Sequence, residues 1–239
     1  MRYLVLTDIH ANIQALDAVL EDAAGRGYTE ILCLGDFVGY GGDPETVLER
    51  LRGLPRLTSI RGNHDKVAAG LWPSTNFSAD ARVAIEWTST VLSARAIAFL
   101  ADLPKGPREL DDVLLCHGAP FDEDYYIFSV TDARRAARGV KRSLCLFGHT
   151  HVCAAYKSGG SPISVDAAIE LSGSGPWLVN VGSVGQPRDG DPRAAYGILD
   201  TDRSRIEFFR VEYDIPAAQR RIRDAGLPLW LAERLSIGR

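Results

Sequence analysis

The stretch LFGHTH, residues 146–151, ends an apolar run with two histidines two positions apart. On an extended backbone, residues i and i+2 face the same side and lie roughly 6.6 Å apart, at about 3.3 Å of rise per residue. Two imidazoles so placed can bind one metal ion or two neighbouring ions. A half-buried strand end with two hydrogen-bonded structural histidines would produce the same pattern. The rest of the chain has to decide between the two interpretations.

Short apolar runs alternate with helical patterns in the first third of the chain. The runs are RYLVLT (2–7), ILCLG (31–35) and LTSIR (57–61). Asn12 is placed to cap a helix over the first connection, and Asp43 precedes Pro44 as a cap precedes the first residue of a helix that runs through Leu51. Strand, helix and strand repeated with short links predict a parallel sheet with right-handed crossovers.

The middle of the chain differs from both ends. Residues 66–110 carry apolar side chains at helical spacing, which predicts a helical insertion. Strand signals return at VLLC (113–116), LCLF (144–147), VCAAY (152–156), LVNV (178–181), AYGIL (195–199) and IEFFRVEY (206–213). Helical patterns follow Pro216 and Pro228. We predict an α/β fold with two β layers and flanking helices, formed by one domain over residues 1–239.

Composition and charge restrict the class of protein. The 239 residues are 46% hydrophobic and 24% charged, as in an ordinary globular protein, and the net charge of −4 argues against a strong nucleic-acid surface. No uninterrupted apolar stretch approaches the ~18 residues of a membrane span, and the start of the chain lacks a signal-peptide pattern. We therefore expect a cytoplasmic protein with no membrane partner. The four cysteines form no C-x-x-C pair and are predicted to be buried free thiols.

Histidine, aspartate and asparagine recur directly after the predicted strands. Five such segments are Asp8-Ile9-His10, Gly35-Asp36, Gly62-Asn63-His64-Asp65, His117-Gly118 and His149-Thr150-His151. Because the carboxyl ends of parallel strands form the rim where ligands bind in open α/β sheets, we expect these side chains to meet at one rim. Scattered core histidines would not be expected to sort in this way.

These side chains are of the types that bind divalent metals. Mixed Asp, His and Asn ligands without thiolate suit Mn, Fe, Zn, Co or Ni. The candidate ligands outnumber what one ion takes, whereas two ions that share a carboxylate would use them, at the roughly 3.5–4 Å spacing of two-metal phosphoryl-transfer sites. That spacing also fits the reach of His149 and His151. The pair at the end of LFGHTH is thus predicted to serve two adjacent ions.

The ordered set D-x-H, G-D, G-N-H-D, H-G and G-H-T-H resembles the calcineurin-like metallophosphoesterase family. The matches run from Asp8 to His151, and the strand pattern beyond them also fits that family. Each motif alone is short, but five in order, each after a strand, are specific. The resemblance implies a four-layer αββα sandwich of two mixed β-sheets flanked by helices.

The resemblance also implies a role for each residue. The metal ligands would be Asp8, His10 and His151 for one ion, Asn63, His117 and His149 for the second, and Asp36 as the bridging carboxylate. His64 resembles the family's non-ligand histidine, which faces the substrate phosphate and helps the leaving group depart. These roles imply that a metal-bound hydroxide attacks phosphorus in line while both cations stabilise the phosphate oxygens.

The segment around the bridging aspartate departs from one branch of the family. Ser/Thr protein phosphatases carry G-D-x-x-D-R-G there, whereas this chain has GDFVGYG, residues 35–41. Gly39 stands where an aspartate would orient the catalytic histidine, and Tyr40 stands where an arginine would bind phosphate. Since a bidentate phosphate anchor is lost, the segment resembles bacterial and archaeal phosphodiesterase-like members more closely. Asp65 either replaces the missing partner of His64 in part or caps a turn or helix.

Further candidates lie outside the motifs. Tyr40 and Arg188 are candidate substrate contacts, although a surface salt bridge would also explain Arg188. The loop of residues 180–188 follows a strand and is expected to pack under the histidine pair. Tyr125 and Tyr126 could line a base-stacking pocket, but ordinary packing is the simpler expectation.

The sequence as a whole predicts a dinuclear metal-dependent phosphoesterase of small phosphodiesters or phosphomonoesters, with nucleotides among the candidate substrates. Manganese is the metal that we expect to support activity in vitro. The alternatives are a phosphoprotein phosphatase and a noncatalytic metal-stabilised binding protein. The pattern leaves the native metals, the physiological substrate and the oligomeric state open.

Overall fold

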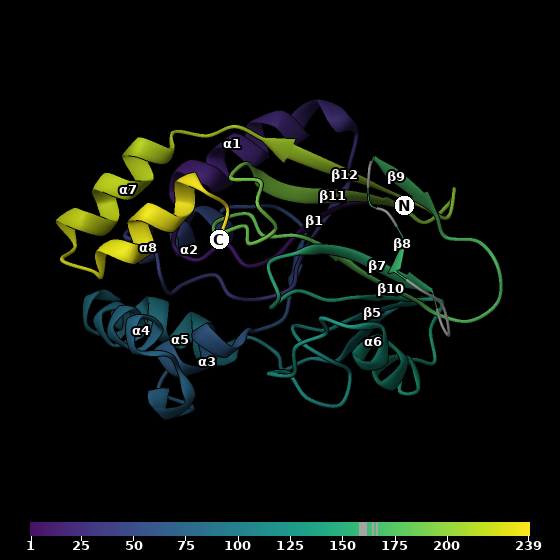
Figure 1. Cartoon of the computed structure of the whole chain (residues 1–239), viewed down its shortest axis with the longest axis horizontal. Helices are drawn as coiled ribbons and strands as arrows, with labels where there is room; N and C mark the ends of the chain where they lie inside the picture. Colours follow the sequence, from purple (N-terminus) through teal and green to yellow (C-terminus); the bar gives the residue numbers. More distant parts are fainter. Residues whose placement is uncertain (158–161, 164, 166) are drawn as a thin grey trace.

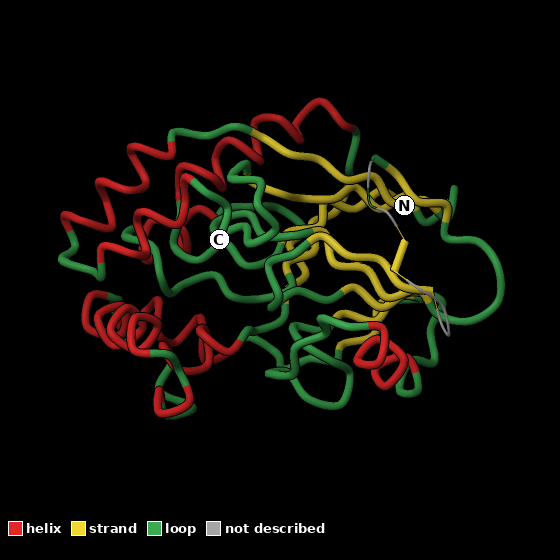
Figure 2. Tube along the Cα trace, viewed as in Figure 1, coloured by secondary structure: helices red, strands yellow, loops and turns green. Residues whose placement is uncertain are grey.

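Two six-stranded β-sheets lie face to face between helices in the computed structural model, which describes residues 1–157, 162–163, 165 and 167–239 (Figures 1 and 2). The first sheet, in spatial order, contains β3 (Leu57–Ser59), β2 (Glu30–Cys33), β1 (Arg2–Leu6), β11 (Ala194–Asp200), β12 (Arg205–Val211) and β9 (Ala168–Glu170). The second contains β4 (Arg108–Leu110), β5 (Val113–Leu115), β6 (Leu144–Leu146), β10 (Trp177–Val181), β7 (Cys153–Lys157) and β8 (Pro162–Ile163). Both sheets are mixed, which confirms the predicted fold class.

The helices lie outside the sheets and beyond one end of them. They are α1 (Ile13–Ala23), α2 (Pro44–Arg52), α3 (Asn63–Ala68), α4 (Ala79–Val91), α5 (Ala94–Asp102), α6 (Val130–Ala137), α7 (Ile215–Asp224) and α8 (Leu229–Glu233). Three short 3₁₀ turns are η1 (Ala24–Arg26), η2 (Ser74–Asn76) and η3 (Arg234–Ser236). Figure 1 shows α3, α4 and α5 grouped below α7 and α8, with α6 on the outer side of the second sheet. No single helix in the described part of the chain is long and apolar enough to cross a membrane.

Alternate residues of the central strands divide the core into layers. In β1, Tyr3 and Val5 pack between the two sheets, whereas Leu4 and Leu6 pack under the outer helices. The second sheet does the same, because Leu115 of β5 faces the intersheet core while Leu114 packs with the alanines of α6. Successive side chains of a strand point to opposite faces, so these strands are apolar on both sides. That double burial explains why the sequence shows them as continuous apolar runs.

The strands that precede the candidate ligands are parallel within each sheet. β1 pairs in parallel with β2, and β2 with β3, so their carboxyl ends lie at one edge of the first sheet. β5 and β6 are parallel in the second sheet. The expected common rim therefore exists, and strands of both sheets contribute to it. Three segments come from the first sheet and two from the second.

The caps of the first two helices differ from each other. Asn12 Oδ1 accepts the N–H of Ala15 at 3.0 Å and caps α1 as predicted. Asp43 stands at the N-cap position of α2, but its carboxylate does not accept a helix N–H; it pairs with Arg221 of α7 at 2.6 Å. The predicted helix start is thus correct, while the side chain joins two helices instead of capping one.

Some elements were predicted wrongly or not at all. The predicted helical stretch 66–110 includes α4 and α5, but its last three residues form β4, an antiparallel edge strand beside β5. β4 is largely exposed, so it lacks the apolar alternation of a strand. The short α6, β8 and β9 were not predicted. The four cysteines are free as expected, with three buried and Cys153 half-buried.

Candidate metal centre

Five of the seven predicted ligands lie on tight loops with their backbone in the left-handed region. Asp8, His10, Asp36, His149 and His151 have φ values between 49° and 67°. Residues with a Cβ rarely adopt this conformation, and it persists where surrounding contacts hold it. The N–H of His10 donates to the carbonyl oxygen of Asp36 at 3.0 Å, and the N–H of His149 donates to the Asp8 carboxylate at 3.1 Å. The loops after β1, β2 and β6 therefore fix one another.

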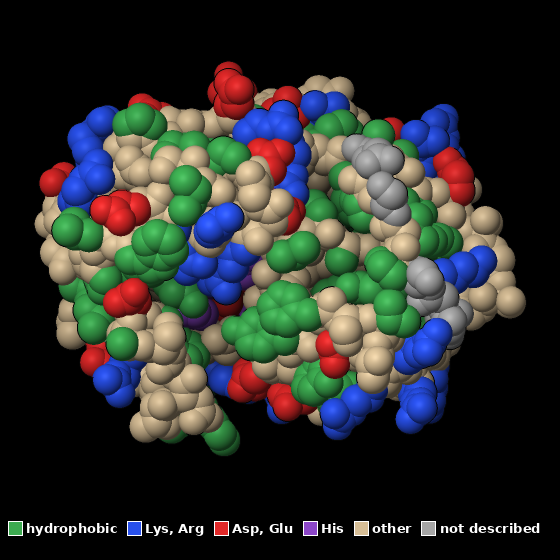
Figure 3. Space-filling view, in the orientation of Figure 1, with side chains coloured by type: hydrophobic (Ala, Val, Ile, Leu, Met, Phe, Trp, Pro, Cys, Tyr) green, Lys and Arg blue, Asp and Glu red, His purple; other side chains and the backbone are tan. Residues whose placement is uncertain are grey.

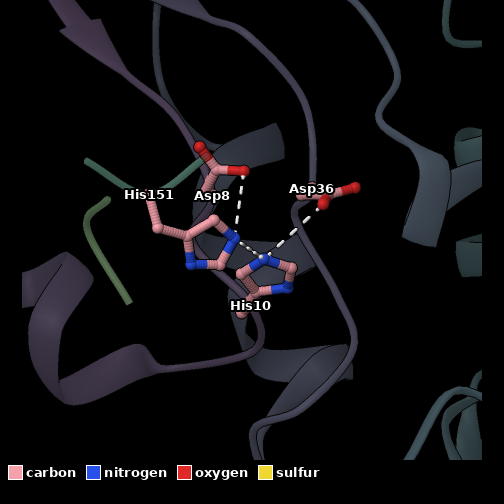
Figure 4. Close-up of side chains that lie close together, drawn as sticks. All are labelled: Asp8, His10, Asp36 and His151. Carbon is pink, nitrogen blue, oxygen red and sulfur yellow. Dashed lines mark hydrogen bonds and ion pairs between the residues drawn. The ribbon is translucent and has the colours of Figure 1, made fainter. Parts of the chain in front are cut away.

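Asp8, His10, Asp36 and His151 form the first ligand group (Figure 4). All four are buried, and one ligand atom from each lies within 4.8 Å of the others. The Nε2 atoms of His10 and His151 are 3.0 Å apart, and His151 Nε2 lies 3.4 Å from Asp8 Oδ1. Such spacings match the edges of a coordination polyhedron with metal–ligand bonds of about 2.1 Å. The group fits one divalent ion.

Asp36, His117 and His149 form the second group, and Asp36 belongs to both. His117 Nε2 lies 3.3 Å from Asp36 Oδ2 and 3.1 Å from Asn63 Oδ1. The same Oδ2 lies 3.5 Å from His10 Nε2, while Asp36 Oδ1 accepts the N–H of His64 at 2.9 Å. One carboxylate oxygen thus faces histidines of both groups, as a bridging ligand requires.

The second nitrogen of each ligand imidazole is held by a backbone carbonyl. The contacts are His10 Nδ1 to Val38 O at 3.0 Å, His117 Nδ1 to Leu34 O at 2.8 Å, His151 Nδ1 to Gln186 O at 2.6 Å, and His149 Nε2 to Asp124 O at 3.1 Å. A carbonyl only accepts, so the proton sits on the nitrogen that faces it and the other nitrogen keeps its lone pair. His149 therefore presents Nδ1 to the site and the other three present Nε2. The predicted loop of residues 180–188 supplies one of these carbonyls, and it packs under the pair.

Burial and charge shift the pKa values of the site residues. Burial lowers the pKa of His10, His149 and His151 well below the usual range, so these imidazoles are neutral. Burial acts to raise the pKa of Asp36, but the charge and hydrogen bond of His117, together with His64 and His10, outweigh it and hold that pKa well below its usual range. His117 is protonated beside Asp36. Its proton lies where the surrounding ligand atoms would otherwise bind a metal cation. The residues present fit divalent metal binding, in two ligand groups that share Asp36.

Asp65 is a cap, not a partner of the His64 ring. Its carboxylate accepts the N–H groups of Gly62 and Asp36 at 2.9 and 2.8 Å, and that of Phe37 at 2.9 Å. These bonds hold the start of α3 against the loop that carries Asp36. Of the two roles considered for Asp65, the structure shows the cap.

His64 is positioned by packing. Its ring centroid lies 4.8 Å from that of His10, 4.5 Å from Tyr40 and 4.6 Å from Phe77. A Cβ at Gly39 would lie 2.2 Å from His64 Nδ1, so the glycine makes room for the ring. Nδ1 is buried without a hydrogen-bond partner among the described residues, and burial lowers the pKa of His64 to about 4. Aromatic contacts thus hold the His64 ring, and the glycine at position 39 has no side chain to orient it.

A cleft of about 360 Å³ opens over the second ligand group and His64. Its wall includes Tyr40, Lys66, Trp72, Phe77, Tyr126, Arg188 and Arg234. In Figure 3 histidine is visible at the bottom of a hollow, with Lys or Arg side chains beside it.

Two candidates behave differently from what the sequence suggested. Tyr126 lines the cleft and stacks on the ring of His149 at 3.8 Å, so the prediction of ordinary packing was wrong for it. Tyr125 does pack in the core beside α6. Arg188 forms no ion pair with a described carboxylate; its guanidinium donates to Gln186 Oε1 at 2.7 Å and lies 5.4 Å from the Tyr40 ring.

Among the residues of this cleft that sequence reasoning missed are Lys66, Trp72, Phe77 and Arg234. Lys66 follows the G-N-H-D motif one turn into α3 and is buried, which a helical projection from Asn63 could have suggested. Trp72 and Phe77 belong to the insertion, whose placement depends on tertiary packing. Arg234 lies more than eighty positions after the last motif, and nothing in its neighbourhood marks it.

Comparisons with known proteins agree with this site. The family described as the calcineurin-like phosphoesterase superfamily domain matches residues 1–204. The uncharacterized protein MJ0912 of Methanocaldococcus jannaschii is 37% identical over 242 residues, which cover 98% of this chain and 97% of that protein. A metallophosphoesterase from Sphaerobacter thermophilus matches with a TM-score of 0.89 and 39% identity, covering 100% of this chain and 99% of its own. The hypothetical protein PH1004 from Pyrococcus horikoshii shares the fold, with a TM-score of 0.82 and 22% identity over 100% of this chain and 98% of its own.

The family match, the fold and the buried Asp/His cluster lead to one conclusion. The chain belongs to the calcineurin-like phosphoesterase superfamily, and it is a hydrolase that acts on phosphate esters.

Proposed function

We propose that this protein binds two divalent metal ions and hydrolyses small phosphodiesters or phosphomonoesters. The observation that carries the proposal is the position of Asp36 Oδ2, 3.5 Å from His10 Nε2 and 3.3 Å from His117 Nε2. A carboxylate oxygen buried between two sets of imidazole nitrogens needs compensating positive charge close by. Two cations supply that charge.

The proposed ligands are Asp8, His10, Asp36 and His151 for the first ion, and Asp36, Asn63, His117 and His149 for the second. Divalent ions bound there would supply Lewis-acid activation of both water and the phosphate ester. Nitrogen and oxygen donors without thiolate suit Mn, Fe, Zn, Co or Ni, and manganese is the first ion to test.

The surrounding side chains position the ester and exclude water. Tyr40 and Phe77 pack against His64 and line the cleft, so a bound phosphate would lie against apolar walls where electrostatic contacts are strong. Position 40 is a tyrosine and carries no positive charge for the phosphate oxygens. Arg188 supplies that charge instead. With its pKa at about 4, His64 is neutral at pH 7, and the negative charge of a nearby phosphate favours its protonated form. We propose that His64 then donates to the leaving oxygen.

A screen with matched substrates tests the proposal. Chelator-treated protein is given Mn²⁺, Zn²⁺, Co²⁺, Ni²⁺ or Mg²⁺ and assayed on an alkyl monoester, a bis-ester and a phosphopeptide. We expect turnover of the small esters that depends on added metal. A preference for the phosphopeptide would favour a phosphoprotein phosphatase. No turnover with any ion, despite bound metal, would favour a noncatalytic metal-stabilised protein.

A further inference from the structure

Two arginines line the cleft beside the candidate metal centre, and both come from the C-terminal half of the chain. Arg188 lies in the loop after β10, and Arg234 begins η3. Arg188 donates to the amide oxygen of Gln186, and Arg234 donates to a main-chain oxygen of Arg239. No side-chain carboxylate among the described residues pairs with either guanidinium. Both guanidinium groups are only partly exposed, so neither is fully hydrated.

Arg188 and Arg234, called the arginine row below, line the same cleft as His64 and the proposed ligands Asn63 and His149. The Arg188 guanidinium lies 5.4 Å from the ring of Tyr40, which in turn lies 4.5 Å from the ring of His64. Both arginines lie in one cleft, where burial and then the charge of Arg188 lower the pKa of Arg234 to about 10, so the two like charges repel each other. Like charges in a partly buried cleft are unfavourable unless an anion lies between or along them.

Aromatic side chains form the walls beside this row. Trp72 and Phe77 come from the insertion, and Tyr126 comes from the loop before α6. Trp72 is 55% exposed and Tyr126 is 43% exposed, although each has a large apolar surface. Such walls suit the organic part of a ligand whose charged ends contact the arginines and the metal centre.

We propose that Arg188 and Arg234 select substrates that carry two phosphate groups. The phosphate to be hydrolysed lies at the metal centre and contacts Arg188, and Arg234 binds the second phosphate. The proposal rests on the proposed function, because the metal centre positions the first phosphate. Arg–phosphate contacts are charge-assisted and bidentate, so one such contact is worth roughly 10- to 100-fold in affinity.

Binding of non-hydrolysable ligands tests the row without catalysis. Calorimetry on the manganese-loaded protein compares alkylphosphonates with alkane bisphosphonates of increasing chain length. We expect the bisphosphonate of one chain length to bind more tightly than the monophosphonate of the same length. Arg234→Gln should reduce this difference in affinity roughly 10- to 100-fold. Arg220→Gln is the matched control, because Arg220 is exposed on α7 and does not line the cleft. No advantage at any length, or an advantage that persists in Arg234→Gln, would overturn the proposal.

Kinetics separate this inference from the proposed function. For the wild type, kcat/KM for an alkanediol bisphosphate should exceed that for the alkyl monophosphate, and Arg234→Gln should reduce the ratio while Arg234→Lys restores part of it. Equal melting temperature and metal content in both variants show that folding is intact. Hydrolysis of simple esters without any preference for the bisphosphate overturns the arginine row alone. If no ester is hydrolysed, the proposed function fails, while a bisphosphonate advantage lost in Arg234→Gln still supports the row.

Discussion

His64 differs from the other four histidines in how it is held. Each ligand histidine donates to a backbone carbonyl, whereas His64 Nδ1 has no partner among the described residues and its ring is fixed by Tyr40, Phe77 and His10. A ring that no acceptor orients can carry its proton on either nitrogen. It is therefore suited to exchange a proton with substrate and unsuited to bind metal.

Replacing His64 tests its proposed role in leaving-group departure. His64→Asn should leave metal content unchanged and slow hydrolysis of an alkyl phosphodiester by roughly 10²–10⁴-fold. The rate of hydrolysis of a nitrophenyl ester should fall much less, because nitrophenolate departs with little help from a proton. Initial rates on both esters, with metal analysis of the same samples, make the comparison.

Three other outcomes for His64→Asn would each contradict this role. Equal losses on both esters would mean that His64 only steadies the phosphate electrostatically. A fall in thermal stability alongside activity would indicate a structural histidine. Unchanged rates would remove His64 from the mechanism.

The identity of most site residues could be predicted, but their surroundings could not. Asp36 and the histidines stand directly after apolar strands, and this local pattern can be recognised without knowledge of the fold. The contacts of His64 with Phe77, and the position of Arg234 in the cleft, depend on how the insertion and the C-terminal helices pack. The spacing of residues along the chain carries no information about such packing.

At the scale of elements, Lys66 ties α3 to the loop that holds His149. Its buried ammonium lies 3.1 Å from Glu123 Oε1 and 2.6 Å from Asp124 Oδ2. The carbonyl of Asp124 in turn accepts His149 Nε2 at 3.1 Å. α3 also carries Asn63, so the ammonium aligns two proposed ligands of the second ion.

Lys66→Met should therefore weaken binding of the second metal ion more than binding of the first. Loss of a group that orients a ligand typically costs roughly 10–100-fold in metal affinity. Titration of the chelator-treated protein with Mn²⁺ should show one weakened step and one nearly unchanged step. Lys105→Met is the control, since Lys105 is 61% exposed and lies 3.9 Å from the same Glu123. Equal weakening of both steps, or the same effect in the control, would contradict the coupling.

The start of α1 is fixed by a side chain that also holds the site. Asn12 Oδ1 caps the helix at Ala15, and its Nδ2 donates to the carbonyl of Gly185 at 2.9 Å in a buried setting. Asn12→Ala loses a helix cap worth about 1 kcal/mol of stability. It also leaves the buried carbonyl of Gly185 without its donor, which costs about 1–3 kcal/mol more. We expect urea denaturation to show a loss of about 2–4 kcal/mol.

Asn12→Ser separates the two contributions. A serine hydroxyl can accept the N–H of Ala15, but it is too short to restore the bond to Gly185. The serine variant should therefore recover about 1 kcal/mol of the alanine loss. If serine and alanine are equally unstable, the cap contributes nothing measurable.

At the scale of the whole molecule, the central strands were predictable because both of their faces are buried. β1, β2, β5 and β6 appear in the sequence as continuous apolar runs. The exposed edge strand β4 lacks this signal, and the three residues of β9 and two of β8 are too few to show any. Which strands share a sheet could not be predicted, because pairing between distant strands leaves no local pattern. That the chain forms one domain stays a prediction.

The arrangement of two sheets explains why the site needs the whole fold. The first sheet brings Asp8, His10 and Asp36, and the second brings His117, His149 and His151. His117 Nδ1 contacts the carbonyl of Leu34, which joins the ends of β5 and β2. Neither sheet alone holds either complete ligand group.

Metal analysis of the Asp36→Asn variant tests the central claim most directly. The wild type should bind two ions per chain, and His151→Ala and His117→Ala should each lose mainly one, the first and the second respectively. Because Asp36 belongs to both groups, Asp36→Asn should lower occupancy at both positions and abolish hydrolysis. Full occupancy by two ions in Asp36→Asn would contradict the shared carboxylate and with it the proposed two-metal site.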